Sequence, residues 1–96
     1  MVCWRSSNFS LLHVENWDGE YTVFQPESGK THFLNEMGLR ILTLLDQTPA
    51  PLDTICAKLA EAFSIQSDGH FQQQIAATLQ RFETLGLIAK IKKTSL

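Results

Sequence analysis

Two tight-turn signals divide the first third of the chain into short strands, and this arrangement constrains the fold more than any other feature. Asp18-Gly19 is typical of a two-residue hairpin turn. Residues 26–29 (PESG) mark a second turn, in which Pro fixes the φ angle and Gly can adopt a positive φ angle. Short strand-like runs flank these turns over residues 11–15, 20–25 and 30–34. We therefore predict an antiparallel three-stranded meander.

Residues 35–86 carry their apolar side chains at helical spacing instead. The first helix is expected from an Asn35 cap to about Leu45, and it is apolar on nearly all sides, which indicates a central position. Two further helices are expected over about 52–63 and 69–85. The predicted fold class is α+β and winged-helix-like, a three-stranded antiparallel sheet followed by three helices.

The 96 residues correspond to one domain, which we assign to 1–96 with an ordered core over about 9–91. Residues 87–91 are expected to add a short extended tail. Cys3, in the expected N-terminal tail, and Cys56 form neither a C-x-x-C pair nor a zinc pattern, so we predict two free thiols. The sequence contains no run of the roughly 20 apolar residues that a membrane span needs, and no secretory signal. We expect a cytoplasmic protein without a membrane partner.

The residues that could carry chemistry do not form a catalytic or metal-binding pattern. His13, His32 and His70 have no carboxylate or second histidine at ligand spacing. Residues 28–31 (SGKT) resemble the end of a phosphate-binding loop, but Phe24 stands where that motif needs glycine, and a strand follows in place of a helix. We predict a protein that is not an enzyme, with no catalytic residue, no metal site and no cofactor.

An open strand edge offers a different kind of site. A three-stranded meander leaves unpaired N–H and C=O groups along its edge, which must be covered or used. An apolar helix face beside such an edge forms a groove for an extended peptide, which adds a strand and inserts alternate side chains. The third helix has one apolar stripe, which serves either this groove or the core: Phe71, Ile75, Leu79, Phe82 and Leu85.

A winged-helix DNA-binding transcription regulator is the alternative. Such a protein needs several Lys or Arg residues on one face of a recognition helix, whereas the third helix offers Arg81 beside Glu83 and several glutamines. The formal net charge of −2 also disfavours nucleic acid, because phosphate contacts supply most of the affinity. A third alternative is a structural subunit that forms a homodimer through its free strand edge.

The order of several runs resembles the PqqD-like peptide chaperones. Residues 23–27 (VFQPE) and 32–35 (HFLN) are similar to that family's strand with a Pro-Glu turn and its Leu-Asn step into the first helix. Residues 40–46 (RILTLLD) and 85–88 (LGLI) are similar to the segments that follow. The resemblance extends over about residues 11–88 and is strongest to a subgroup encoded beside a kinase related to the HPr kinase.

This resemblance implies the fold called the RiPP recognition element and a non-catalytic role. Family members bind the leader of a ribosomally made precursor peptide and present it to a peptide-modifying enzyme. The leader pairs as an extra strand with the third strand and rests against the third helix. Transferred to this sequence, the implied peptide-binding residues are Lys30, Thr31, His32, Phe33, Leu34, Phe71, Ile75, Thr78, Leu79 and Phe82.

Overall fold

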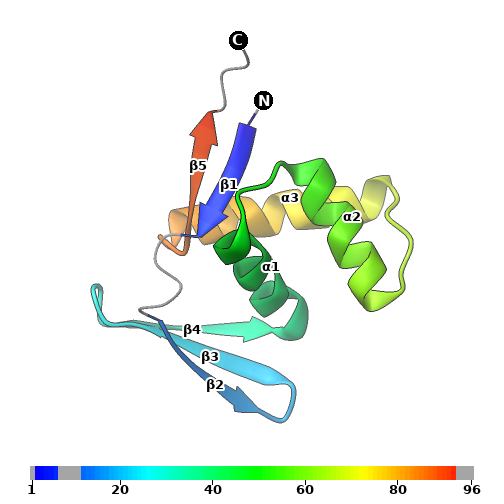
Figure 1. Ribbon diagram of the computed structural model, residues 1–96. Coiled ribbons are helices and arrows are strands. Elements are labelled where there is room, and N and C mark those ends of the chain that lie inside the picture. Colours follow the sequence, from blue (N-terminus) through cyan, green and yellow to red (C-terminus); the bar gives the residue numbers. More distant parts are fainter. Residues whose placement is uncertain (1, 7–11, 93–96) are drawn as a thin grey trace.

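The predicted meander is present in the computed structural model, which describes residues 2–6 and 12–92. Strands β2 (His13–Trp17), β3 (Glu20–Gln25) and β4 (Lys30–Asn35) form an antiparallel sheet in the order β2-β3-β4 (Figure 1). Residues 9–11, which we expected to open the ordered core and the first strand, lie outside the described residues.

Three helices follow the sheet, so the predicted fold class is confirmed. They are α1 (Glu36–Gln47), α2 (Leu52–Phe63) and α3 (Gly69–Thr84). The Asn35 side chain caps α1, because its Oδ1 accepts a hydrogen bond from the Gly38 N–H at 2.8 Å. Asp68 caps α3 in the same way through the Phe71 N–H, also at 2.8 Å.

A second, two-stranded sheet was not predicted from the sequence. Strand β1 (Val2–Ser6) pairs antiparallel with β5 (Ile88–Lys92), so the segment expected as an N-terminal tail is a strand. Trp4 attaches this ribbon to the loop after α1, since its N–H and C=O both hydrogen bond to Ala50, at 2.9 and 3.0 Å. The two sheets lie at opposite ends of the helical layer (Figure 1). The pairing escaped prediction because β1 has its partner at the far end of the chain, and short strands carry little local signal.

The core lies between the helices and the inner faces of both sheets. Its largest fully buried side chains are Phe82, Ile41, Leu42, Leu45, Ile55, Leu59, Leu79, Leu87, Ile88, Val23 and Cys56. Gly38 lets α1 approach α3, because a Cβ at this position would lie 3.2 Å from Phe82 Cζ. Cys3 and Cys56 are both free, as predicted, and both are buried, although Cys3 was expected in an N-terminal tail. Within the described residues, no helix has the length and apolar character to cross a membrane.

Candidate functional site

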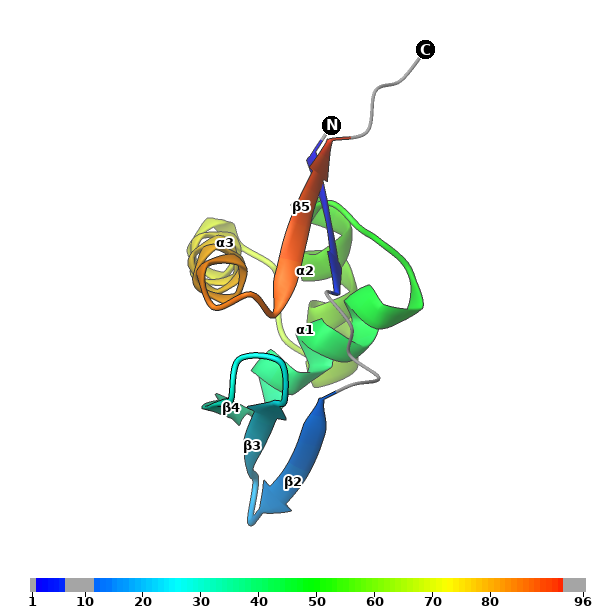
Figure 2. The ribbon, with the colours of Figure 1, turned by 90° about the vertical axis from the view of Figure 1, so that its left-hand side faces the viewer.

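Strand β4 has one neighbour in its sheet. It pairs with β3, and no other strand among residues 2–6 and 12–92 lies along its second side. The chain's own last strand pairs with β1, in the separate ribbon (Figure 2). The described part of the molecule therefore leaves this edge open for another strand.

The turn between β2 and β3 determines which backbone groups face the open edge. Asp18 and Gly19 have φ values of 50° and 90°, as in a two-residue type I′ turn. In such a hairpin the closing pair, here Trp17 and Glu20, exchanges both hydrogen bonds, and every second pair along the ladder repeats this pattern. The intervening residues of β3 therefore direct their N–H and C=O groups towards β4.

One of these intervening residues is Val23, which lies opposite His32 of β4. Val23 and His32 are consequently a hydrogen-bonded pair. The adjacent residues of β4, Thr31 and Phe33, direct their N–H and C=O groups away from β3. The open edge thus presents the donors and acceptors of these two residues.

The side chains of β4 alternate between two environments. His32 and Leu34 face the core and are 8 % and 5 % exposed. Thr31 and Phe33 face outward, and Phe33 is 71 % exposed. Lys30 is exposed at the start of the strand. The five predicted β4 residues therefore lie together along one strand, but they divide between its two faces.

The predicted residues of α3 mostly belong to the core. Phe71, Ile75, Leu79 and Phe82 are buried members of the main hydrophobic cluster, and Leu79 is 0 % exposed. Thr78 is half-buried, and its Oγ1 donates a hydrogen bond to the backbone C=O of Gln74 at 3.0 Å. The sequence left open whether the apolar stripe of α3 lines a groove or belongs to the core, and the structure shows that it belongs to the core. A role of these buried side chains in binding stays a prediction.

The accessible flank of α3 on the β4 side is polar. Glu83 lies on the other flank, where it is paired with Lys90 of β5 at 4.0 Å. Successive residues of an α-helix are rotated by about 100° around its axis, so Thr78 and Arg81 project from the side of α3 opposite to Glu83. Arg81 lies near enough to β4 for its charge to lower the pKa of His32. The sequence shows Arg81 as the only Lys or Arg of this helix, but the pattern relates it only to DNA binding.

His32 joins the sheet to the turn that follows α3. Its Nε2–H donates to Gln25 Oε1 at 2.6 Å, and the same Gln25 side chain donates from Nε2 to the Gly86 C=O at 3.4 Å. Burial is the main reason that the pKa of His32 lies below its ordinary value of 6.5, with the positive charges of Lys30 and Arg81 adding to the effect. The imidazole is therefore held neutral and serves as a structural link at the site.

The lowered pKa predicts that the protein loses stability as the pH falls. The imidazole of His32 binds a proton more readily in the unfolded chain than in the folded protein. The contribution of neutral His32 to the free energy of unfolding is therefore fully present above pH 6.5, and it is lost as the pH falls through the pKa of the folded state. Urea unfolding at pH 7.5, 6.5 and 5.5 should show that the free energy of unfolding declines with falling pH in the wild type. The decline should be smaller in His32→Gln. His70→Gln, at an exposed position of α3, is the matched control and should retain the wild-type pH dependence. Equal pH dependence in His32→Gln and wild type would contradict this assignment.

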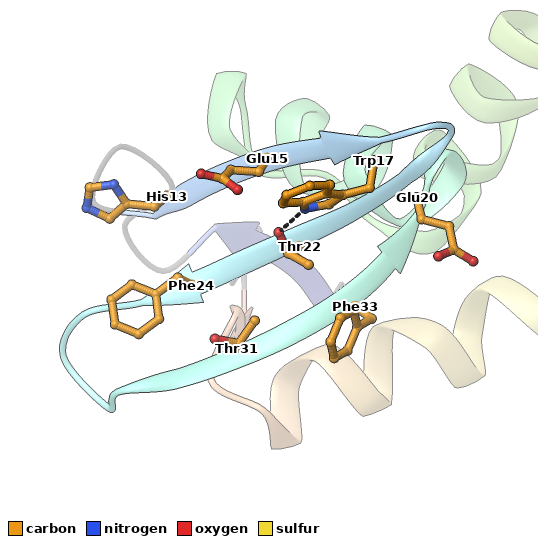
Figure 3. Close-up of a pocket in the computed structure, with 8 residues that line it drawn as sticks. All are labelled: His13, Glu15, Trp17, Glu20, Thr22, Phe24, Thr31 and Phe33. Carbon is orange, nitrogen blue, oxygen red and sulfur yellow. Dashed lines mark hydrogen bonds between the residues drawn. The ribbon is translucent and has the colours of Figure 1, made fainter.

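The outer face of the meander carries a surface hollow that the sequence analysis missed. The hollow measures about 580 Å³ and is lined by side chains from all three strands, namely His13, Glu15, Trp17, Glu20, Thr22, Phe24, Thr31 and Phe33 (Figure 3). Trp17 is 60 % exposed and is fixed by a hydrogen bond from its Nε1–H to Thr22 Oγ1 at 3.0 Å. Strand alternation in the sequence places these residues on one face, but only the pairing register shows that they are neighbours.

Comparison with known proteins adds two findings. The family profile described as "Coenzyme PQQ synthesis protein D (PqqD)" matches residues 20–88. A solved structure described as "TbiB1 in Complex with the TbiA(beta) Leader Peptide" has a similar fold, with a TM-score of 0.66 and 17 % sequence identity. That similarity covers 88 % of this chain and 93 % of the other. No curated protein gives a significant match. Because the family profile spans well over half of the sequence, the chain belongs to the PqqD family.

Proposed function

We propose that this protein is a non-catalytic adaptor that binds the leader segment of a ribosomally made precursor peptide by strand addition. The observation that carries the proposal is the open edge of β4, where Thr31 and Phe33 direct their backbone groups outward. The solved structure of similar fold contains a leader peptide, which supports the same kind of occupant here. The membership of the PqqD family is consistent with this role.

Strand addition explains how one small domain accepts a flexible peptide. β4 has six residues, so a peptide of about the same length gains main-chain hydrogen bonds that depend little on its sequence. Its side chains then alternate between the α3 side, near Thr78 and Arg81, and the outer face of the meander, near Phe33. Specificity comes from these two sets of contacts.

The further partner that we propose is a peptide-modifying enzyme, to which the bound leader is presented. We also propose that the chain is a single domain over 1–96 with a cytoplasmic location. Residues 28–35 and 85–88 continue to favour the subgroup encoded beside a kinase related to the HPr kinase. The subgroup and the partner enzyme rest on the sequence resemblance, and the genes adjacent to this one would test both.

A titration with the leader of a neighbouring short open reading frame tests the proposed function. The leader is added to ¹⁵N-labelled protein, and amide shifts are followed by NMR. We expect the largest shifts over residues 30–35 and on the α3 flank around Thr78 and Arg81. A scrambled leader of the same composition is the control and should produce weaker shifts. Shifts spread over α1 and α2, with none in β4, would contradict strand addition.

A further inference from the structure

We propose that the peptide docked on β4 carries a cationic side chain, Arg or Lys, at the outward position beside Phe33 and Glu20. The inference rests on the proposed function and deepens it, because it specifies the chemistry of one peptide position. An added strand continues the pleat of the sheet, so every second side chain of the peptide must emerge on the outer face. The residues already on that face determine which side chain is favoured there.

Glu20 and Phe33 occupy the same corner of the outer face. Phe33 lies opposite Thr22, and Glu20 lies opposite Asn35, so Glu20 and Phe33 are diagonal neighbours across the β3–β4 ladder (Figure 3). A second, smaller hollow of about 240 Å³ lies at this corner and is lined by Glu20, Phe33, Leu34 and Asn35. The corner adjoins the open edge, because Phe33 belongs to β4.

The two side chains attract the same kind of group. Phe33 is 71 % exposed, and an exposed aromatic face binds a cation that lies within about 6 Å of the ring centre. Glu20 supplies a carboxylate, and no described Lys or Arg forms an ion pair with it. None of the residues that line either hollow is a Lys or Arg. A peptide guanidinium or ammonium group would therefore meet a ring and an unpaired negative charge together.

A second copy of the chain is a poor occupant of this face. Self-association through it would bury the Glu15 and Glu20 carboxylates of both copies, with no Lys or Arg among the lining residues to pair with them. The outward position beside Phe33 therefore favours a peptide that brings its own cation.

A displayed library of random ten-residue peptides tests the inference without knowledge of the natural leader. Selection on the wild-type protein should enrich Arg or Lys at one position of the binding motif. For one enriched peptide, replacing the cation by Gln should weaken binding about fivefold. Nuclear Overhauser contacts between that peptide side chain and the Phe33 ring identify the position.

Charge reversal provides the decisive comparison. Glu20→Lys should shift the selected residue at that position from Arg or Lys to Asp or Glu. Glu15→Lys is the matched control, because Glu15 lies on the same face but in β2, two strands away from the open edge. That variant should leave the preference beside Phe33 unchanged.

The possible failures are distinguishable. Peptides that require the β4 edge but show no charge preference beside Phe33 would overturn this inference and leave the proposed function intact. Peptides whose binding is unaffected by proline in β4, or a library that yields no binder, would count against both. Concentration-dependent dimerisation that Glu20→Lys abolishes would instead assign the face to a second copy and overturn the inference.

Discussion

Replacing Thr31 with proline should weaken leader binding by at least about tenfold while the sheet stays folded. The Thr31 N–H points to the open edge, so proline removes a donor that the peptide would use and places a ring where the peptide backbone approaches. The loss of one such hydrogen bond together with steric interference corresponds to roughly 1.4 kcal/mol or more. Proline is tolerated on edge strands when its nitrogen faces outward. Isothermal titration calorimetry on the variant and the wild type measures the difference.

Two matched variants separate a binding effect from a folding effect. Val14→Pro introduces the same change at the other edge of the meander, where the N–H of Val14 also points outward by the same alternation, and it should retain binding. His32→Pro should destabilise the fold, because the N–H of His32 takes part in the ladder with β3. If Thr31→Pro unfolds the domain, as judged by circular dichroism, the assignment of the open edge is wrong.

Replacing Phe82 with alanine should lower the free energy of unfolding by about 3–5 kcal/mol. The Phe82 side chain is 1 % exposed and packs against Gly38 of α1, so its removal leaves a cavity between two helices. Urea unfolding of wild type and variant measures the loss. Because a domain of this size has only about 5–15 kcal/mol of stability in total, the milder Phe82→Leu should be measured beside it.

Phe82 also tests whether the buried α3 stripe has a second role in peptide binding. If the stripe serves the core alone, the fraction of Phe82→Leu that is folded should bind the leader with nearly wild-type affinity. Gln80→Ala, at an exposed position on the same helix, is the control and should alter stability and binding little. A Phe82 variant that is fully stable but no longer binds the leader would instead place this side chain in the groove, as the family resemblance implies.

The meander and the three helices could be predicted because their signals are local. Asp18-Gly19 encodes its turn within two residues, and Asn35 and Asp68 cap their helices through amides three residues away. The β1–β5 ribbon could not be predicted in this way. The pairing of Cys3 with Ile91 joins the two ends of the sequence, and no short window contains both strands.

The candidate site was predictable only in part, for a related reason. The sequence identified the edge strand, because residues 30–34 form the last strand of the meander however the helices pack against the sheet. It could not determine how the α3 stripe divides between core and groove, because burial depends on where α1 and α2 are placed. The corner formed by Glu20 and Phe33 depends on the β3–β4 register, in which a shift by one residue would move Phe33 to the other face.

The β1–β5 ribbon has a consequence for any protein that is joined to this one. Val2 and Lys92 are paired across it, so both ends of the described domain emerge side by side, on the far side of the helices from β4 (Figure 2). An enzyme, a tag or an additional domain fused at either end would be attached on that side, away from the open edge of β4. Such a tether would raise the local concentration of the fused partner around the bound peptide, whichever end of the gene carries the fusion.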